Sequence, residues 1–258
     1  NLFLFITKKD FFFFCLIIII SSFGFSQNVG TMFYSGDLNG FGGESMTFSN
    51  GRWQVSLQAG ANNANSNFLF RDSNSNFDNK WSRGTTISFG NIETAFYNGA
   101  DTEINVTNTK YYTFNLSDVS VNNDGELIVQ ETDNAPIDFA SSSPVTQNLT
   151  TIYPGQDLVV TVNLSGGKSA QEKAFVRYSS DGFTTSEVEE VTFASSTASS
   201  GTATIPGSDN TAGANVSYYV YTTTVSATST SNHDLITLNL ENNGGSNYSY
   251  TVENSWTT

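Results

Sequence analysis

The stretch Val119–Val129, VSVNNDGELIV, decides the fold class of this chain. Apolar and polar residues alternate on both sides of the Asp124-Gly125 pair. A period of two places successive side chains on opposite faces of a β-strand, and Asp-Gly between two such runs is a strong hairpin signal. We therefore predict a β-hairpin at Val119–Val129 within an antiparallel sheet.

The same period of two continues along the rest of the chain. Past residue 26 the sequence shows no apolar stripe with the 3.6-residue period of a helix. The other strands predicted in the first half are Thr31–Tyr34, Arg52–Leu57, Asn67–Arg71, Thr85–Ser88, Thr102–Val106 and Tyr111–Leu116. Those predicted in the second half lie within residues 156–166, 173–182, 187–195, 201–207, 214–224, 235–243 and 249–255. These patterns predict an all-β protein.

A break in the strand pattern divides the chain. Residues Asn134–Pro144, NAPIDFASSSP, are mostly turn formers and small residues. The short strands after this break have the spacing of a Greek-key β-sandwich. We predict two tandem antiparallel β-sandwich domains of immunoglobulin-like or fibronectin type III-like shape, at residues 27–134 and 145–254.

The first 26 residues have the pattern of a secretory signal peptide. Lys8 and Lys9 precede an unbroken apolar run, Phe11–Ile20, and the small residues Gly24 and Ser26 fit a cleavage site. The run is about half of the roughly 20 residues that a membrane-spanning helix needs. We expect a secreted, extracellular or cell-surface protein with no membrane span after cleavage. The chain's one cysteine lies inside this run, so the mature protein has no disulfide.

The charge of the chain excludes one class of partner. The formal net charge is −14, with 24 acidic and 10 basic residues. A surface that follows a phosphate backbone needs clustered Lys and Arg, so nucleic acid is not an expected partner. Asn, Ser, Thr and Gly dominate the predicted loops, and such neutral polar surfaces suit neutral ligands such as glycans.

The second half resembles the immunoglobulin-like modules that precede catalytic domains in secreted bacterial α-amylase-type and related polysaccharide-degrading enzymes. Four stretches carry the resemblance: FVRYSSDGFTTSEV (Phe175–Val188), TATIPG (Thr202–Gly207), VSYYVYTTT (Val216–Thr224) and NNGGSNYSYTV (Asn242–Val252). Modules of this kind carry no catalytic residues.

The first half is similar to the early-set, starch-binding type of sandwich. The matching stretches are MFYSGDLNGFGGESM (Met32–Met46), GRWQVSLQA (Gly51–Ala59) and NFLFRDSNSNFDNKWSRG (Asn67–Gly84), with Phe41 where a tryptophan is usual. The two resemblances imply a non-catalytic, extracellular carbohydrate-binding module pair of a glycan-processing protein, with α-glucan or a related polysaccharide as its partner.

One loop combines the side chains that hold a sugar. An aromatic face covers the C–H patch of a sugar ring, and planar polar groups satisfy its hydroxyls. The candidate carbohydrate-binding residues are Trp81, Lys80, Asn79, Arg71, Arg83 and Phe41. One stacked ring is insufficient after the cost of association, so a working site also needs Phe41, Phe77 or Tyr34.

Two of the tryptophans have a structural interpretation. The alternative for Trp81 is a buried plug that closes the end of the sandwich. Trp53 begins an alternating strand with Val55 and Leu57 on the same face, and we predict that it belongs to the core. Trp256 lies beside polar residues near the end of the sequence, where it can belong to a following domain.

The same loop has a weaker resemblance to a calcium loop. Asp72, Asn74, Asn76 and Asp78 place oxygen donors at every second position. A full calcium loop needs Gly at its sixth position and Glu at its twelfth, where this chain has Phe77 and Arg83. We expect a solvated Asx-rich turn, and neither a metal nor another cofactor.

The sequence nominates no catalytic residues. The one histidine, His233, lies in a Ser/Thr/Asn-rich connection that we predict to be a surface loop, and no G-x-S-x-G, H-E-x-x-H or phosphate-binding glycine loop accompanies it. We predict a non-enzymatic protein. The alternatives are a structural or adhesive cell-surface protein without a glycan site, or a fragment of a larger glycoside hydrolase whose catalytic or sorting domain follows this sequence.

Overall fold

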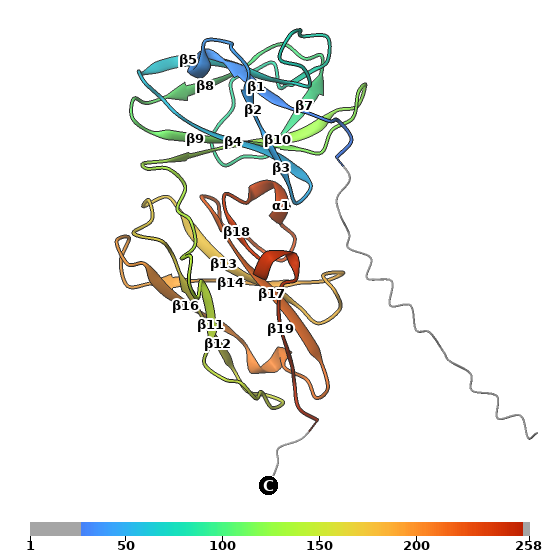
Figure 1. Ribbon diagram of the computed structural model, residues 1–258, viewed down its shortest axis with the longest axis vertical. Coiled ribbons are helices and arrows are strands. Elements are labelled where there is room, and N and C mark those ends of the chain that lie inside the picture. Colours follow the sequence, from blue (N-terminus) through green and yellow to red (C-terminus); the bar gives the residue numbers. More distant parts are fainter. Residues whose placement is uncertain (1–26, 255–258) are drawn as a thin grey trace, which may run out of the picture.

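The computed structural model describes residues 27–254 as two stacked bodies of antiparallel β-sheet (Figure 1). The predicted signal peptide at residues 1–26, and Trp256 with its neighbours at 255–258, lie outside the described residues. Every ladder between named strands in the described part runs antiparallel. The all-β prediction is confirmed. Within residues 27–254, none of the helices has the length and apolar content needed to span a membrane.

The first body is one ten-stranded sheet that folds over its own core. Its strands are β1 (Phe33–Gly36), β2 (Glu44–Ser45), β3 (Thr47–Ser49), β4 (Arg52–Gln58), β5 (Asn63–Arg71), β6 (Lys80–Ser82), β7 (Glu93–Tyr97), β8 (Thr102–Val106), β9 (Tyr111–Ser117) and β10 (Gly125–Thr132). The order is β2-β1-β5-β6-β7-β10-β9-β4-β3, with β8 beside β5. Phe68 of β5 meets Phe114 of β9 at 4.9 Å between ring centroids, so the two halves of the sheet face each other.

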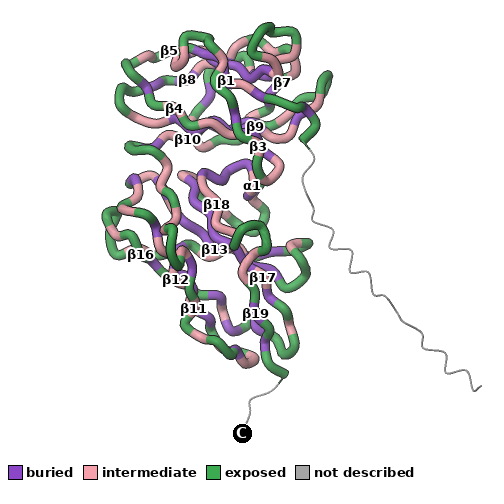
Figure 2. The backbone as a smooth tube through the Cα atoms, viewed as in Figure 1, coloured by how far each residue is buried: buried purple, intermediate pink, exposed green. Residues whose placement is uncertain are grey.

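The second body has two facing sheets. Its strands are β11 (Val145–Gln147), β12 (Leu158–Asn163), β13 (Lys173–Ser179), β14 (Glu187–Glu190), β15 (Thr192–Phe193), β16 (Ser200–Ile205), β17 (Asn215–Thr223), β18 (Leu240–Glu241) and β19 (Tyr248–Thr251). One sheet has the order β11-β12-β16-β15 and the other β14-β13-β17-β18, with β19 beside β17. The alternating residues of β12 and β16 bury one face each against the other sheet, forming a sandwich-like core. In β17 nearly every residue after Ser217 is buried, because its second face is covered too (Figure 2).

Four short helical turns lie in the connections. They are η1 (Asp37–Asn39), η2 (Gly207–Asp209), α1 (His233–Ile236) and η3 (Asn243–Gly245). The sequence predicted a strand at residues 235–243, but its first two residues complete α1 and only β18 is extended. The prediction at Thr85–Ser88 was also wrong, because this segment forms a single bridge from Thr86 to Glu103 and no ladder.

The hairpin predicted at Val119–Val129 exists with a different upstream strand. Leu127 pairs with Leu116 of β9, so residues 118–124 form the connection. Val119 is buried in the core instead of extending a strand. The hydroxyl of Ser117 accepts a hydrogen bond from the backbone N–H of Glu126. This bond joins β9 to β10, and the Asp124-Gly125 pair lies between the two bonded residues.

The two bodies meet where α1 lies on the β4-β9-β10 face of the first body (Figure 1). A helix end leaves backbone carbonyls without partners, and in α1 the side-chain amides of the first body satisfy them. Asn115 Nδ2 donates to Leu235 O (2.6 Å) and Thr237 O (2.9 Å), Gln130 Nε2 to Ile236 O (2.8 Å), and Gln54 Nε2 to Thr237 O (2.9 Å). We call these hydrogen bonds the amide junction.

Apolar side chains surround the amide junction. Ile128 of the first body packs with Phe175, Tyr221, Leu235 and Ile236 of the second. The hydrogen bonds of Asn115 and Gln130 are buried beside this cluster, where breaking one leaves both partners unpaired, and the bond of Gln54 lies at the edge of the contact. The junction thus fixes the orientation of the two bodies.

The amide junction predicts a large effect of Gln130→Leu. The Gln130 side chain is fully buried, and its Oε1 also accepts hydrogen bonds from Thr223 and Thr224. The substitution leaves several buried groups unpaired, so we expect the free energy of unfolding to fall by about 3 kcal/mol. Urea denaturation measures it.

Gln58→Leu is the matched control, because Gln58 is exposed and makes one side-chain hydrogen bond, to Thr109. We expect it to change stability by less than about 1 kcal/mol. Equal losses in the two variants would contradict the role given to the amide junction.

Candidate functional site

Trp81, the leading sugar-stacking candidate, is fully buried in the core of the first body. Its indole N–H donates to the carbonyl of Asn123 at 2.9 Å, and the ring packs edge-on against Tyr97 at 5.6 Å. The ring has no exposed face for a ligand. The structure therefore corrects the stacking role and agrees with the alternative, a buried plug. Trp53 is also buried, which confirms its predicted place in the core.

Arg71 organises the loop that the sequence singled out. Its side chain is buried at the end of β5, where Nη2 donates to Phe41 O at 3.4 Å and to Asn74 Oδ1 at 3.2 Å. Nη1 donates to the carbonyl of Asn76 at 3.4 Å, and the guanidinium lies 4.2 Å from the centroid of the Phe77 ring. One cation thus holds the loop at residues 40–43 against the loop at residues 72–79.

Two aromatic side chains on these loops are exposed. Phe41 is 37% exposed and Phe77 is 45% exposed. The backbone of Phe41 is left-handed, with φ of 61°, a conformation that costs a bulky residue free energy. Gly43 fits closely there, since an added Cβ would overlap the side chain of Asn74. We call Phe41, Arg71 and Phe77 the rim patch.

The other predicted sugar-binding residues have protein partners. Asn79 binds the hydroxyl of Tyr97 at 2.5 Å and the carboxylate of Asp72 at 2.8 Å. Lys80 forms an ion pair with Asp101, and Arg83 forms one with Glu93. The structure brings Phe41 and Arg71 together, and the side chains of Asn79, Lys80 and Arg83 are engaged elsewhere. Tyr34, offered as a second aromatic, is fully buried.

The oxygen donors of the calcium-like loop bind protein groups. Asn74 Oδ1 accepts from Arg71, Asp72 Oδ2 accepts from Asn79, and Asn76 Oδ1 accepts the backbone N–H of Asp78. The guanidinium of Arg71 therefore supplies positive charge at this loop. The side-chain oxygens of Asp72, Asn74 and Asn76 therefore serve contacts within the protein, one of them with Arg71.

His233, predicted to lie in a surface loop, is buried at the first position of α1. The sequence prediction was wrong because the helix that carries His233 packs on the first body, a contact that local polarity does not reveal. The ring Nδ1 lies 2.9 Å from the hydroxyl of Tyr221. Burial and the positive charge of Arg177 lower the pKa of His233 to about 4.

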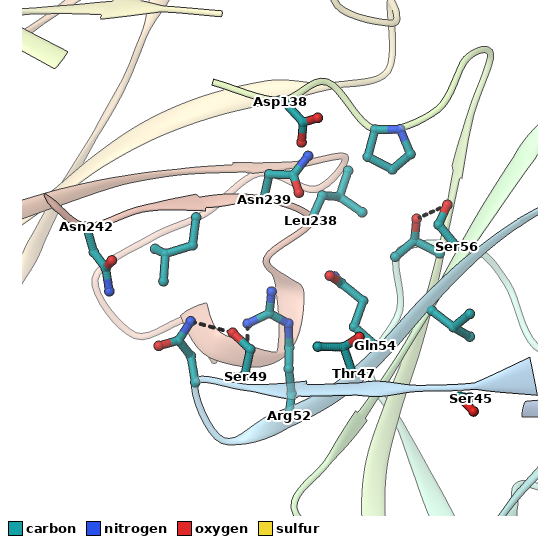
Figure 3. A pocket seen from close by; sticks show the side chains of 15 residues that line it. Ser45, Thr47, Ser49, Arg52, Gln54, Ser56, Asp138, Leu238, Asn239 and Asn242 are labelled. Atoms are coloured by element: carbon teal, nitrogen blue, oxygen red, sulfur yellow. Dashed lines mark hydrogen bonds between the residues drawn. The ribbon is translucent and has the colours of Figure 1, made fainter. Parts of the chain in front are cut away.

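A groove with a volume of about 650 Å³ lies between the two bodies (Figure 3). Strands β2, β3 and β4 form one wall, and residues 136–138 and 238–242 form the other. Its polar lining includes Thr47, Arg52, Asp138, Asn239 and Asn242. Sequence reasoning missed this groove, because its lining comes mainly from three separate segments of the chain, residues 45–56, 136–138 and 238–242, which only the folded structure brings together.

Comparisons of this chain with protein-family models, with curated proteins and with solved structures give no match. A function for the chain therefore follows from its own residues and their geometry.

The buried histidine predicts a loss of stability in acid. The folded-state pKa of about 4 is below the ordinary value of 6.5, so the unfolded chain binds the proton more tightly. The stabilisation is complete above about pH 6.5 and is lost as the pH falls toward 4, by roughly 3 kcal/mol in total. Denaturation at a series of pH values measures this dependence.

His233→Gln is the comparison, because it removes the titrating group and keeps a hydrogen-bonding side chain beside Tyr221. Burial raises the pKa of the neighbouring Asp234, an effect of opposite sign that both proteins share. We expect the stability of the variant to fall less between about pH 6.5 and about pH 4. Parallel curves for the two proteins would contradict the buried, neutral state of His233.

Proposed function

We propose that the chain is a non-catalytic pair of β-sandwich modules, residues 27–134 and 145–254, that binds a neutral polysaccharide outside the cell. The observation that carries this proposal is the rim patch, in which Arg71 holds two exposed phenylalanine rings on adjoining loops. In this proposal the rings of Phe41 and Phe77 take the stacking role that the sequence gave to Trp81. The second module is a spacer.

The size of the rim patch sets the expected affinity. If a sugar chain covers about 80 Å² on each ring, the two rings contribute roughly 4 kcal/mol before the cost of association. A millimolar complex needs about 4 kcal/mol net. We therefore expect weak binding to single sugars and useful retention only on a polymer, where repeated sites raise the effective concentration.

A leader that directs export is part of the proposal, since an extracellular polysaccharide is accessible only to an exported protein. The apolar run with preceding lysines and following small residues supports it. α-Glucan is the polysaccharide that the resemblance of the first half suggests. The parent protein would then be a glycan-processing protein in which the reaction belongs to another domain.

The second candidate is a structural or adhesive surface protein. The amide junction favours it, because a fixed orientation of two bodies suits a rigid building block. In that case the rim patch would have no sugar to bind.

Affinity electrophoresis in gels with soluble starch, glycogen or other polysaccharides separates the two candidates. We expect retardation of the unmodified protein in at least one gel. Phe41→Ala and Phe77→Ala each weaken it, and the double variant migrates as in a gel without polysaccharide. Alanine carries about the same backbone cost as phenylalanine at the left-handed position 41, so the change tests the ring.

Phe96→Ala is the matched control, since Phe96 is 38% exposed and lies over Arg83, outside the rim patch. It should leave the retardation unchanged. Migration that no polysaccharide alters, or an equal effect of all three alanine variants, would favour the structural candidate.

A further inference from the structure

We infer that the groove between the two bodies binds a carboxylate-bearing sugar, a hexuronate, with Arg52 as the anchor for the carboxylate. This site is separate from the rim patch and does not depend on the function proposed above.

Arg52 is a buried cation with almost no partner. Only 3% of the residue is exposed, and within residues 27–254 its side chain makes one hydrogen bond, from Nη1 to Ser49 O at 3.5 Å, while its buried Nε has no partner there. None of the ion pairs within residues 27–254 includes Arg52. Arg71, equally buried, also has a buried Nε without a partner within the described residues, but its two terminal nitrogens make three hydrogen bonds and its guanidinium contacts the Phe77 ring. Burying a charge without partners is unfavourable. An anion in the groove would therefore stabilise the N–H groups of Arg52 that have no protein partner.

The acidic group whose charge acts on Arg52 makes no ion pair with it. Asp234 of α1 interacts electrostatically with Arg52 and also with Arg177, and it forms an ion pair with neither. The charge of Asp234 thus acts on two guanidinium groups, in a chain whose overall net charge is −14. Burial lowers the pKa of Arg52 to about 10, which still leaves it charged at neutral pH.

The guanidinium of Arg52 lies among the polar side chains that line the groove (Figure 3). A planar guanidinium with free N–H groups matches a carboxylate with two parallel hydrogen bonds. The groove volume of about 650 Å³ falls in the range of small-molecule sites and accommodates one or two sugar rings.

The other residues that line the groove determine which groups the ligand must carry besides its carboxylate. Hydroxyls of Ser45 and Thr47 lie on one wall, and the amides of Asn239 and Asn242 lie on the other. Asp138 lies across the groove from Arg52, where its carboxylate can accept from a ligand hydroxyl and would repel a second negative charge (Figure 3). A sugar ring with one carboxylate and several hydroxyls therefore fits the groove, with the carboxylate at Arg52 and a hydroxyl at Asp138.

Titration calorimetry with glucuronate, with glucose as its neutral counterpart, tests the inference. We expect one glucuronate site per chain and an affinity for glucose that is at least about tenfold weaker. Arg52→Gln should reduce the glucuronate affinity to the level of glucose. Arg52→Lys should give an intermediate affinity, because an ammonium keeps the charge and loses the paired donors.

Thr47→Trp keeps the test valid if Arg52→Gln fails to fold. Thr47 is an exposed residue of β3 in the groove wall, and a tryptophan there fills the groove without changing Arg52. It should abolish binding, whereas Thr94→Trp, on an exposed position of β7, should not. The Phe41→Ala, Phe77→Ala double variant should bind glucuronate normally.

The assignment would be overturned by no binding of glucuronate, by equal binding of glucuronate and glucose, or by binding that Thr47→Trp leaves unchanged. Inorganic sulfate with the affinity of glucuronate would also overturn it, since the groove would then be a general anion site.

Discussion

The carbonyl groups at the end of α1 need hydrogen-bond donors, and the first body supplies them. Three side-chain amides, from Gln54, Asn115 and Gln130, reach across to residues 235–237. A four-residue helix has no stability of its own, so its presence depends on this contact. The groove depends on it as well, because each wall belongs to a different body.

Each candidate site contains a buried arginine, Arg71 in the rim patch and Arg52 in the groove. Arg71 makes the contacts that hold two loops together and leaves two phenylalanine rings exposed above them. Arg52 is buried in the groove with little to bind. In a chain with 24 acidic and 10 basic residues, these arginines are more informative than the surface charge. Arg71 binds groups of the protein itself, and Arg52 is available to a ligand.

Sequence patterns predicted the fold where local periodicity decides the structure. The alternation in β12 and β16 shows directly which residues face the core, and the break after Thr132 precedes the second set of strands. Local patterns gave wrong predictions where contacts between residues far apart in the chain determine the structure. Leu235 and Ile236 look like strand residues, but the amides of the first body and the apolar cluster around Tyr221 stabilise a helical turn there.

In the candidate sites, too, sequence patterns indicated what local composition determines and missed what distant contacts determine. The sequence pointed to the loop that carries Phe77 of the rim patch, because aromatic, basic and Asx residues cluster there. It ranked Trp81 first, and a local pattern cannot show that this ring points inward to Asn123. The cross-strand partner of Trp81 is Phe70, and both rings fill the core. Arg52 gave no signal, because its isolation is a property of the assembled junction.

The fixed orientation of the two bodies is the central claim, and residual dipolar couplings of the backbone amides test it most directly. If the amide junction holds, couplings from residues 27–132 and from residues 145–254 fit one alignment tensor with the orientation of Figure 1. Two tensors of different magnitude or direction would show that the bodies move independently, and would contradict the account of both the junction and the groove.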